Sequence, residues 1–300
     1  MIGRLRHRFW KLTRGCLFAV TLSVMASTAM ATPAAADGNV PQPPPQRLSA
    51  GEIARLGLKS GVANSYAQFK RGGGTPAQFI SSVAELELQL NDGKPLVGGV
   101  TDPTHQSEPT AAQSLYEQNN IWPMFATQQY WYFCGPADAW MTLNWKYPGH
   151  ASFDGDPLTQ TAVADIQWLG TVDPDGTAYG ANWTTTFNAW MDGDPAGYYV
   201  RANSPSAAAI GNYVSFDVDY GWASVLDVLM NNNHGGYLPG FTADEGDADG
   251  NIWHYVTATG YSGYGAVIGY LDPSPLGANV YTYANASQFQ SLMSGYGMIF

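Results

Sequence analysis

Residues 128–146 read QQYWYFCGPADAWMTLNWK, and this stretch joins an aromatic run to a segment with the features of a helix. Pro136 suits the first turn of a helix, where a backbone N–H is not needed. The apolar side chains that follow repeat at helical spacing: Ala137, Trp140 and Met141. The sequence therefore predicts a helix from Cys134 to Lys146, ended by Pro148-Gly149.

Cys134 stands at the start of this predicted helix, where the positive end of the helix dipole favours a thiolate. Gly135 leaves room for another chain to approach the backbone. The sequence contains two cysteines, and Cys16 lies in the N-terminal leader described next, so Cys134 has no partner for an intramolecular disulfide. A lone cysteine of this kind is either a reactive thiol or a small buried apolar residue.

The first 31 residues have the three parts of a signal peptide. A basic region from Arg4 to Arg14 precedes an apolar run from Leu17 to Met25, and Ala29-Met30-Ala31 is a cleavage signal. We expect residues 1–31 to be removed and the protein to be secreted; the alternative is an uncleaved N-terminal anchor. No later run reaches the roughly 18 apolar residues of a membrane helix, so we expect no integral membrane association after cleavage.

The composition indicates a packed protein with few charges. Of 300 residues, 45% are hydrophobic and only 12% are charged, which argues against global disorder. The formal net charge is -11, and loss of the basic leader makes it more negative. A nucleic-acid partner needs a basic surface, so we expect none.

Changes in composition divide the rest of the chain. Residues 32–46 form a Pro/Ala-rich tether, and 47–92 form a small helical hairpin, either a pro-segment or an appendage. Capping boxes begin its two helices: Ser49 to Glu52 and Thr75 to Gln78. Residues 93–113 are a Gly/Pro/Thr-rich linker, and 114–300 form the main domain.

The main domain is predicted to have an α+β fold, with helices first and an antiparallel sheet later. A second helix is predicted from Trp222 to Met230 because of its apolar spacing. Four apolar runs in the C-terminal third predict strands: His254 to Thr259, Ala266 to Leu271, Val280 to Tyr283 and Met298 to Phe300.

A thiolate nucleophile needs a base, and His254 is the histidine best placed to be one. The other histidines fall in the leader, the linker or turns: His7, His105, His150 and His234. Asp272 ends the next predicted strand, so hairpin pairing would bring its carboxylate beside His254 to orient the ring. Gln128 lies six residues before Cys134 and could supply a second donor to an oxyanion.

These elements together resemble the C39-like cysteine peptidases of the papain superfamily. The resemblance covers roughly 114–300 and includes Asp175-Gly176-Thr177, followed by an aromatic helix near Trp183 to Trp190. It implies a papain-like fold in which helices carrying the cysteine pack on a sheet carrying the histidine and aspartate. It also implies that Cys134 is the nucleophile, His254 the base, Asp272 the residue that orients it and Gln128 part of the oxyanion hole. Asp138 departs from the family pattern, where a small residue is common.

An acidic loop precedes His254. Its oxygens at alternating positions are a weak candidate for calcium, with a solvated acidic turn as the alternative: Asp247, Asp249 and Asn251. The histidines and cysteine are too scattered for a zinc site. We expect no cofactor and no other metal.

Three functions remain open on these residues. The first is a secreted thiol hydrolase that cleaves peptide bonds in a peptide or protein substrate. The second is a non-catalytic binding module on the same fold, and the third is a cell-wall amidase or acyl transferase with the same dyad. The aromatic run from Tyr130 to Phe133 either lines a substrate cleft or packs in the core.

Overall fold

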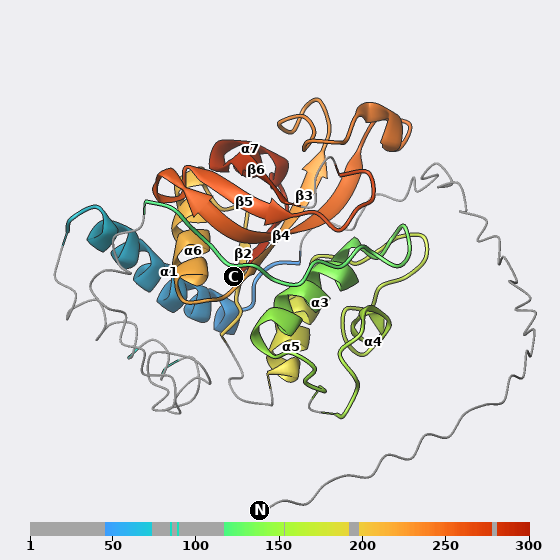
Figure 1. The fold of residues 1–300 in the computed structure, drawn as a ribbon, viewed down its shortest axis with the longest axis horizontal. Coiled ribbons are helices and arrows are strands. Elements are labelled where there is room, and N and C mark those ends of the chain that lie inside the picture. The colour runs from blue at the N-terminus through green and yellow to red at the C-terminus, as the bar shows by residue number, and fades with distance from the viewer. Residues whose placement is uncertain are drawn as a thin grey trace, which may run out of the picture. The chain divides into compact units, whose positions relative to one another are not determined.

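A computed structural model describes residues 46–73, 85, 89, 117–152, 154–191, 198–277 and 281–300 (Figure 1). The predicted signal peptide, the tether before Gln46, the linker 93–113 and most of the second helix of the hairpin lie outside the described residues. Within the described part of the chain, no helix has both the length and the apolar character needed to cross a lipid bilayer.

The described strands form one antiparallel sheet in the order β2-β7-β3-β4-β5-β6. Their bounds are Arg201–Asn203 (β2), Ser224–Met230 (β3), Ile252–Ser262 (β4), Val267–Leu271 (β5), Tyr281–Asn285 (β6) and Gly297–Ile299 (β7). The short strand β1 (Asn119–Asn120) pairs with the far end of β4, opposite Gly260 and Tyr261. The longest strand, β4, therefore lies at the centre of the sheet.

Helices cover both faces of the sheet (Figure 1). One hydrophobic cluster joins the sheet to α1 (Ala50–Lys70), α6 (Ala207–Asp219) and α7 (Ala286–Leu292). A second cluster joins the other face to α3 (Cys134–Lys146), α4 (Gln160–Ala164) and α5 (Ala181–Trp190). Two 3-10 turns complete the described elements: η2 (Ala243–Glu245) and η3 (Gly263–Gly265). The predicted α+β class is confirmed.

The predicted helix from Trp222 to Met230 is wrong, because this segment contains β3. All residues of β3 are buried. Val225 belongs to the cluster of α3 and α5, whereas Leu226 and Val228 belong to the cluster of α1 and α6. A strand covered on both faces has no polar alternate positions, so its apolar run has the same composition as a short buried helix. By contrast, the helix predicted from Cys134 to Lys146 is confirmed as α3.

α1 begins as the sequence predicts, at a capping box. The Glu52 N–H donates to Ser49 Oγ at 3.3 Å, and the Ser49 N–H donates to Glu52 Oε2 at 2.8 Å. The inward face of this helix also carries buried charges beside its apolar residues, which the sequence did not predict. Ion pairs join it to β2 and α6: Glu52 to Arg201 at 2.6 Å, Lys59 to Asp217 at 3.2 Å and Lys70 to Asp219 at 2.9 Å.

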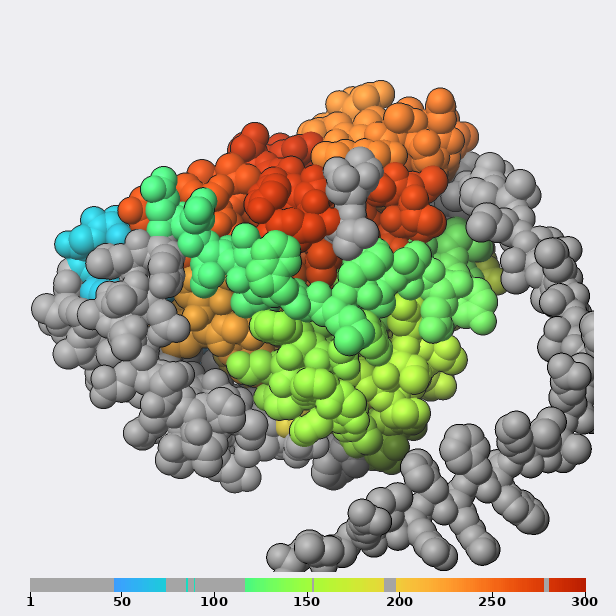
Figure 2. Space-filling model, viewed as in Figure 1, coloured from blue at the N-terminus to red at the C-terminus, as the bar shows by residue number. Residues whose placement is uncertain are grey.

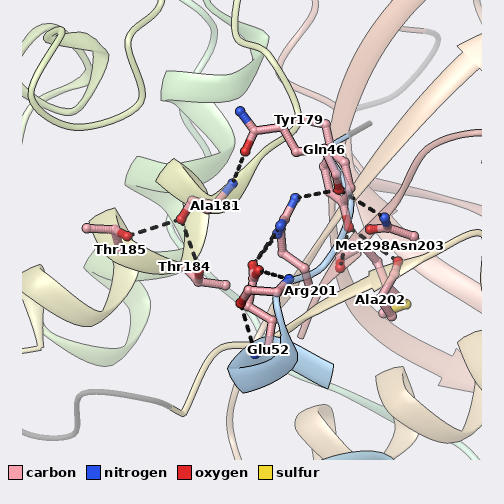
Figure 3. A network of polar contacts seen from close by, with 11 residues as sticks. Gln46, Glu52, Tyr179, Ala181, Thr184, Thr185, Arg201, Ala202, Asn203 and Met298 are labelled. Carbon is pink, nitrogen blue, oxygen red and sulfur yellow. Dashed lines mark hydrogen bonds and ion pairs between the residues drawn. The ribbon is translucent and has the colours of Figure 1, made fainter. Parts of the chain in front are cut away.

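Gln46, just before α1, is held in place near the Glu52–Arg201 ion pair (Figure 3). The backbone oxygen of Gln46 accepts hydrogen bonds from Arg201 and Asn203 at 3.4 and 3.2 Å. The side chain of Gln46 accepts one from the Ala181 N–H, at the first turn of α5, at 3.4 Å. The start of α1 is thus tied to both β2 and α5.

Lys59 is the most deeply buried of the charged residues on α1. Its side chain is 0% exposed, and its Nζ lies 3.6 Å from the centroid of the Tyr198 ring. Asp217 also accepts hydrogen bonds from Tyr198 and Ser224, each at 2.9 Å. Burial lowers the pKa of Lys59 to about 8, although Asp217 opposes this shift. Asp217 is thus held by two hydrogen bonds as well as by the ion pair, whereas Lys59 is stabilised by the carboxylate and the Tyr198 ring alone.

We predict that Lys59→Ala lowers the free energy of unfolding by about 3–5 kcal/mol, because it leaves Asp217 as an uncompensated buried charge. The double variant Lys59→Met/Asp217→Asn should recover much of this loss, since it leaves no buried charge and keeps an acceptor for Ser224. Urea denaturation measures both. Ile53→Ala, at a position of α1 that is 57% exposed, is the control. A Lys59→Ala variant as stable as the control contradicts this account.

Candidate active site

Cys134 is the first residue of α3, and its side chain lies at the edge of the buried core. The residue is 9% exposed. The helix has no side-chain cap at Phe133, and its first hydrogen bond runs from the Ala137 N–H to the Phe133 oxygen at 2.9 Å. The N–H groups of the first turn have no acceptor within the helix. The Cys134 thiol and its own backbone N–H are thus at the same helix end.

The structure brings Cys134, His254 and Asp272 together. The side chain of Cys134 lies close enough to the ring of His254 to interact with it, and His254 lies near the start of β4. His254 Nε2 lies 2.8 Å from Asp272 Oδ1, so Nδ1 is the ring nitrogen left for the thiol. The β4–β5 pairing sets this contact, because Leu271 lies opposite Thr257 and Asp272 follows directly.

Asp272 is itself held in place by its surroundings. Its Oδ1 also accepts a hydrogen bond from the Ser274 N–H at 2.9 Å. Gly277 closes onto the carboxylate: a Cβ there would lie 2.9 Å from Asp272 Cγ. The Phe241 ring lies on His254, with 5.2 Å between ring centroids. With His254 4% and Asp272 2% exposed, the imidazole has one orientation fixed by packing and hydrogen bonding.

Two opposing effects act on the pKa of His254. Burial favours the neutral ring and lowers the pKa, whereas the charge and hydrogen bond of Asp272 and the contact with Cys134 raise it. The sum raises the pKa of His254 well above its ordinary value. An imidazolium is therefore favoured beside the thiol at neutral pH, which is the charge state that stabilises a thiolate.

Gln128 lies next to this group but is engaged with its own turn. Its backbone N–H donates to the Pro273 oxygen at 3.0 Å, beside Asp272. Its side-chain amide donates to the oxygens of Tyr130 and Trp131 at 3.1 and 2.6 Å. The structure thus places Gln128 against the loop that follows β5, with its amide holding the turn that leads into α3.

Gly135 is required by close packing against Thr177. A Cβ at Gly135 would lie 2.5 Å from Thr177 Oγ1. Thr177 is buried, bonds Thr171 through its hydroxyl at 2.7 Å and accepts a hydrogen bond from Tyr255 at 3.0 Å. The Asp175-Gly176-Thr177 segment therefore forms one wall beside Cys134.

Two further buried carboxyl groups lie near His254, and the sequence analysis gave neither a role. Asp138, one helical turn after Cys134, is hydrogen-bonded to Thr257 of β4. Asp227 of β3 lies opposite Tyr255. Burial raises the pKa of both well above the ordinary value, although His254 opposes this. Both therefore favour the neutral form, and the charged partner of His254 is Asp272. The sequence offered one indication of this for Asp138: it lies four residues after Cys134, so the two side chains share one face of the helix.

The acidic loop before β4 uses its oxygens to hold its own turn. Asp247 Oδ1 accepts from the N–H groups of Asp249 and Asn251 at 2.8 and 2.9 Å, and Oδ2 accepts from the Asn251 amide at 3.1 Å. Asn251 Oδ1 accepts from Asn231 at 2.6 Å. These contacts favour the solvated acidic turn over a calcium site. Among the described residues, no three His, Cys, Asp or Glu side chains form a group that could hold a metal ion.

The neutral state of Asp138 predicts a pH dependence of stability. In the unfolded chain this carboxyl ionises near pH 3.8, whereas the folded protein keeps it protonated to higher pH. The folded state then binds more protons than the unfolded state, so stability falls as pH rises above about 4. We expect Asp138→Asn to lack this fall.

Urea denaturation of both proteins at several values between pH 4 and 7 tests this. As the pH rises from 4 to 7, the unfolding free energy of Asp138→Asn should increase steadily relative to that of the wild type. Asp138→Ala should be less stable than Asp138→Asn by about 1–3 kcal/mol, because the Thr257 hydroxyl loses its partner. A difference that does not change with pH would show that Asp138 is ionised in the folded protein.

Comparison of the chain with protein-family models, with curated proteins and with solved structures finds no match, so the reading of this site rests on its residues and their geometry.

Proposed function

We propose that the protein is a secreted thiol hydrolase that cleaves peptide bonds, with a papain-like arrangement similar to that of the C39-like cysteine peptidases. The observation that carries the proposal is the chain of contacts from the Cys134 thiol through the His254 ring to Asp272 Oδ1. A nucleophile, a base and a residue that orients the base are the three parts that this chemistry requires.

In the first half of the reaction, Cys134 Sγ attacks the carbonyl carbon of the peptide bond, and the carbonyl π electrons move to oxygen. Collapse of this tetrahedral species breaks the C–N bond. The amine leaves with the proton held on His254 Nδ1, and the acyl group remains on Cys134 as a thioester. Asp272 keeps the His254 ring in position while the charge of the ring changes.

In the second half, His254 takes a proton from water, and the water oxygen attacks the thioester carbon. The C–S bond breaks, the acid is released, and the thiolate–imidazolium pair is restored. An amine in place of water would give acyl transfer by the same steps. The residues of this site therefore do not by themselves choose between hydrolysis and transfer.

The oxyanion of each tetrahedral species needs hydrogen-bond donors that are already in position. The backbone N–H of Cys134 is one, because the first turn of α3 offers it no acceptor. The Gln128 amide is the second, and it would turn from the oxygen of Tyr130 or Trp131 to reach the substrate. The tight packing of Gly135 on Thr177 keeps the start of α3 in place for this contact.

The proposed location and partners follow from the sequence. The leader of residues 1–31 supports secretion, and the substrate is a peptide or protein. The acidic net charge argues against nucleic acid.

The proposal predicts that iodoacetamide alkylates Cys134 rapidly below pH 7, because the mechanism requires a thiolate stabilised by the His254 imidazolium. His254→Ala should slow this alkylation. The same variant should lower kcat/KM for peptide hydrolysis by about 10²–10⁴-fold, the usual loss on removing a general acid–base. Cys134→Ala should abolish turnover while leaving the melting temperature nearly unchanged.

Turnover retained in Cys134→Ala would rule out the thiol mechanism. A Cys134 that titrates as an ordinary thiol near pH 8.5, or reacts only after denaturation, would mean a structural cysteine and support a binding module instead.

A further inference from the structure

A row of exposed aromatic side chains lies on the segment that leads from β1 to Cys134. Figure 2 shows this segment (green) exposed on one face, bordered by the C-terminal part of the chain (red). Four of its large apolar side chains are between 48 and 65% exposed: Trp122, Met124, Tyr130 and Trp131. Phe125 and Tyr132 are half-buried, and Phe133 is buried. The first two rings of the aromatic run before Cys134 are thus on the surface.

The neighbouring strand β6 extends this surface. The ring centroids of Trp122 and Tyr281 lie 5.1 Å apart, and those of Tyr281 and Tyr283 also lie 5.1 Å apart. Tyr283 is 49% exposed. We call the six side chains the aromatic strip: Trp122, Met124, Tyr130, Trp131, Tyr281 and Tyr283.

The backbone that carries the strip is fixed at several points. The Ile121 N–H donates to the Thr259 oxygen of β4 at 2.8 Å, and the Gln128 N–H donates to the Pro273 oxygen at 3.0 Å. Gln160 holds the same segment through the Thr127 oxygen and the Gln129 N–H, at 2.9 and 3.0 Å. The rings therefore lie on a preorganised support, which reduces the entropy lost when a ligand binds.

The two segments that carry the strip have few charged residues, although Asp173 of a neighbouring loop lies near Tyr132. Residues 118–137 contain no acidic or basic side chain. In the segment from Tyr255 to Phe300 the only charged side chain is that of Asp272, which is buried. A polyanion or an anionic membrane surface would find no basic side chain to pair with on these segments. Exposed Tyr, Trp and Met with Lys, Glu and Asp absent is instead the composition of surfaces that bind other polypeptides.

We propose that the aromatic strip binds the bulky apolar side chains of an uncharged stretch of polypeptide and presents that stretch to Cys134. The inference rests on the proposed function, and it adds the substrate class. Tyr130 and Trp131 lie four and three residues before Cys134 in the sequence, so they are the part of the strip nearest the nucleophile along the chain. They act here as specificity-determining residues.

The test compares cleavage of paired synthetic peptides. A library of uncharged peptides, digested with the purified protein and analysed by mass spectrometry, first identifies cleaved sequences. Each cleaved peptide is then compared with a copy in which its aromatic and large aliphatic residues are replaced by alanine. For the wild type, kcat/KM should be about tenfold or more higher for the bulky peptide, the selectivity expected of apolar contacts.

In Tyr130→Ala/Trp131→Ala this ratio should fall to within about threefold of unity. In Tyr130→Phe/Trp131→Phe, which keeps two rings, the ratio should stay high, and this variant also shows that the turn tolerates substitution. Ile53→Ala removes an exposed apolar side chain from α1 and should leave the ratio at the wild-type value.

The inference is overturned if the alanine double variant keeps the wild-type ratio, or if cleaved sites are charged and lack bulky residues. Failure of the proposed function looks different: wild-type Cys134 would then react slowly with iodoacetamide, a reagent too small to need the strip, and no peptide would be cleaved.

Discussion

The pairing of β3 with β4, buried on both faces, is the constraint on which the rest of the structure depends. These strands pair continuously from Ser224 opposite Ala258 to Met230 opposite Ile252. Because helices cover both faces, each polar side chain in this region needs a partner inside the protein. The candidate site is where several such partnerships meet: α3 packs on one face and brings Cys134 to the start of β4, and β5 brings Asp272 to the same place.

The interior accommodates its buried ionisable groups in two different ways. Lys59 with Asp217 and His254 with Asp272 are ion pairs, in which each charge offsets the burial of the other. Asp138 and Asp227 are instead placed where the neutral acid is favoured. The difference matters at His254: one carboxylate matches the imidazolium, whereas three ionised carboxylates would bury an excess of negative charge beside Cys134.

Sequence reasoning succeeded where the signal is local and failed where it depends on tertiary packing. The capping box at Ser49 predicts the start of α1, and the placement of Pro136 helps to predict the helix from Cys134 to Lys146. The spacing of two strands in a hairpin predicts that Asp272 lies beside His254. β3 was mistaken for a helix because burial on both faces removes its periodicity. The contact between Asp138 and Thr257 depends on how α3 lies on β4, and the buried charges of α1 depend on which face meets α6; neither is encoded in spacing alone.

The charged inner face of α1 also bears on how the chain can be shortened. Loss of α1 would uncover the apolar side chains of α6 and the sheet that share a hydrophobic cluster with Ala63, Tyr66 and Phe69. It would also leave Arg201, Asp217 and Asp219 without the counterions that α1 supplies. An expressed fragment that begins after Lys70 therefore inherits three ionic defects, and a useful N-terminal boundary lies before Gln46, where the contacts of β2 and α5 with the incoming chain start.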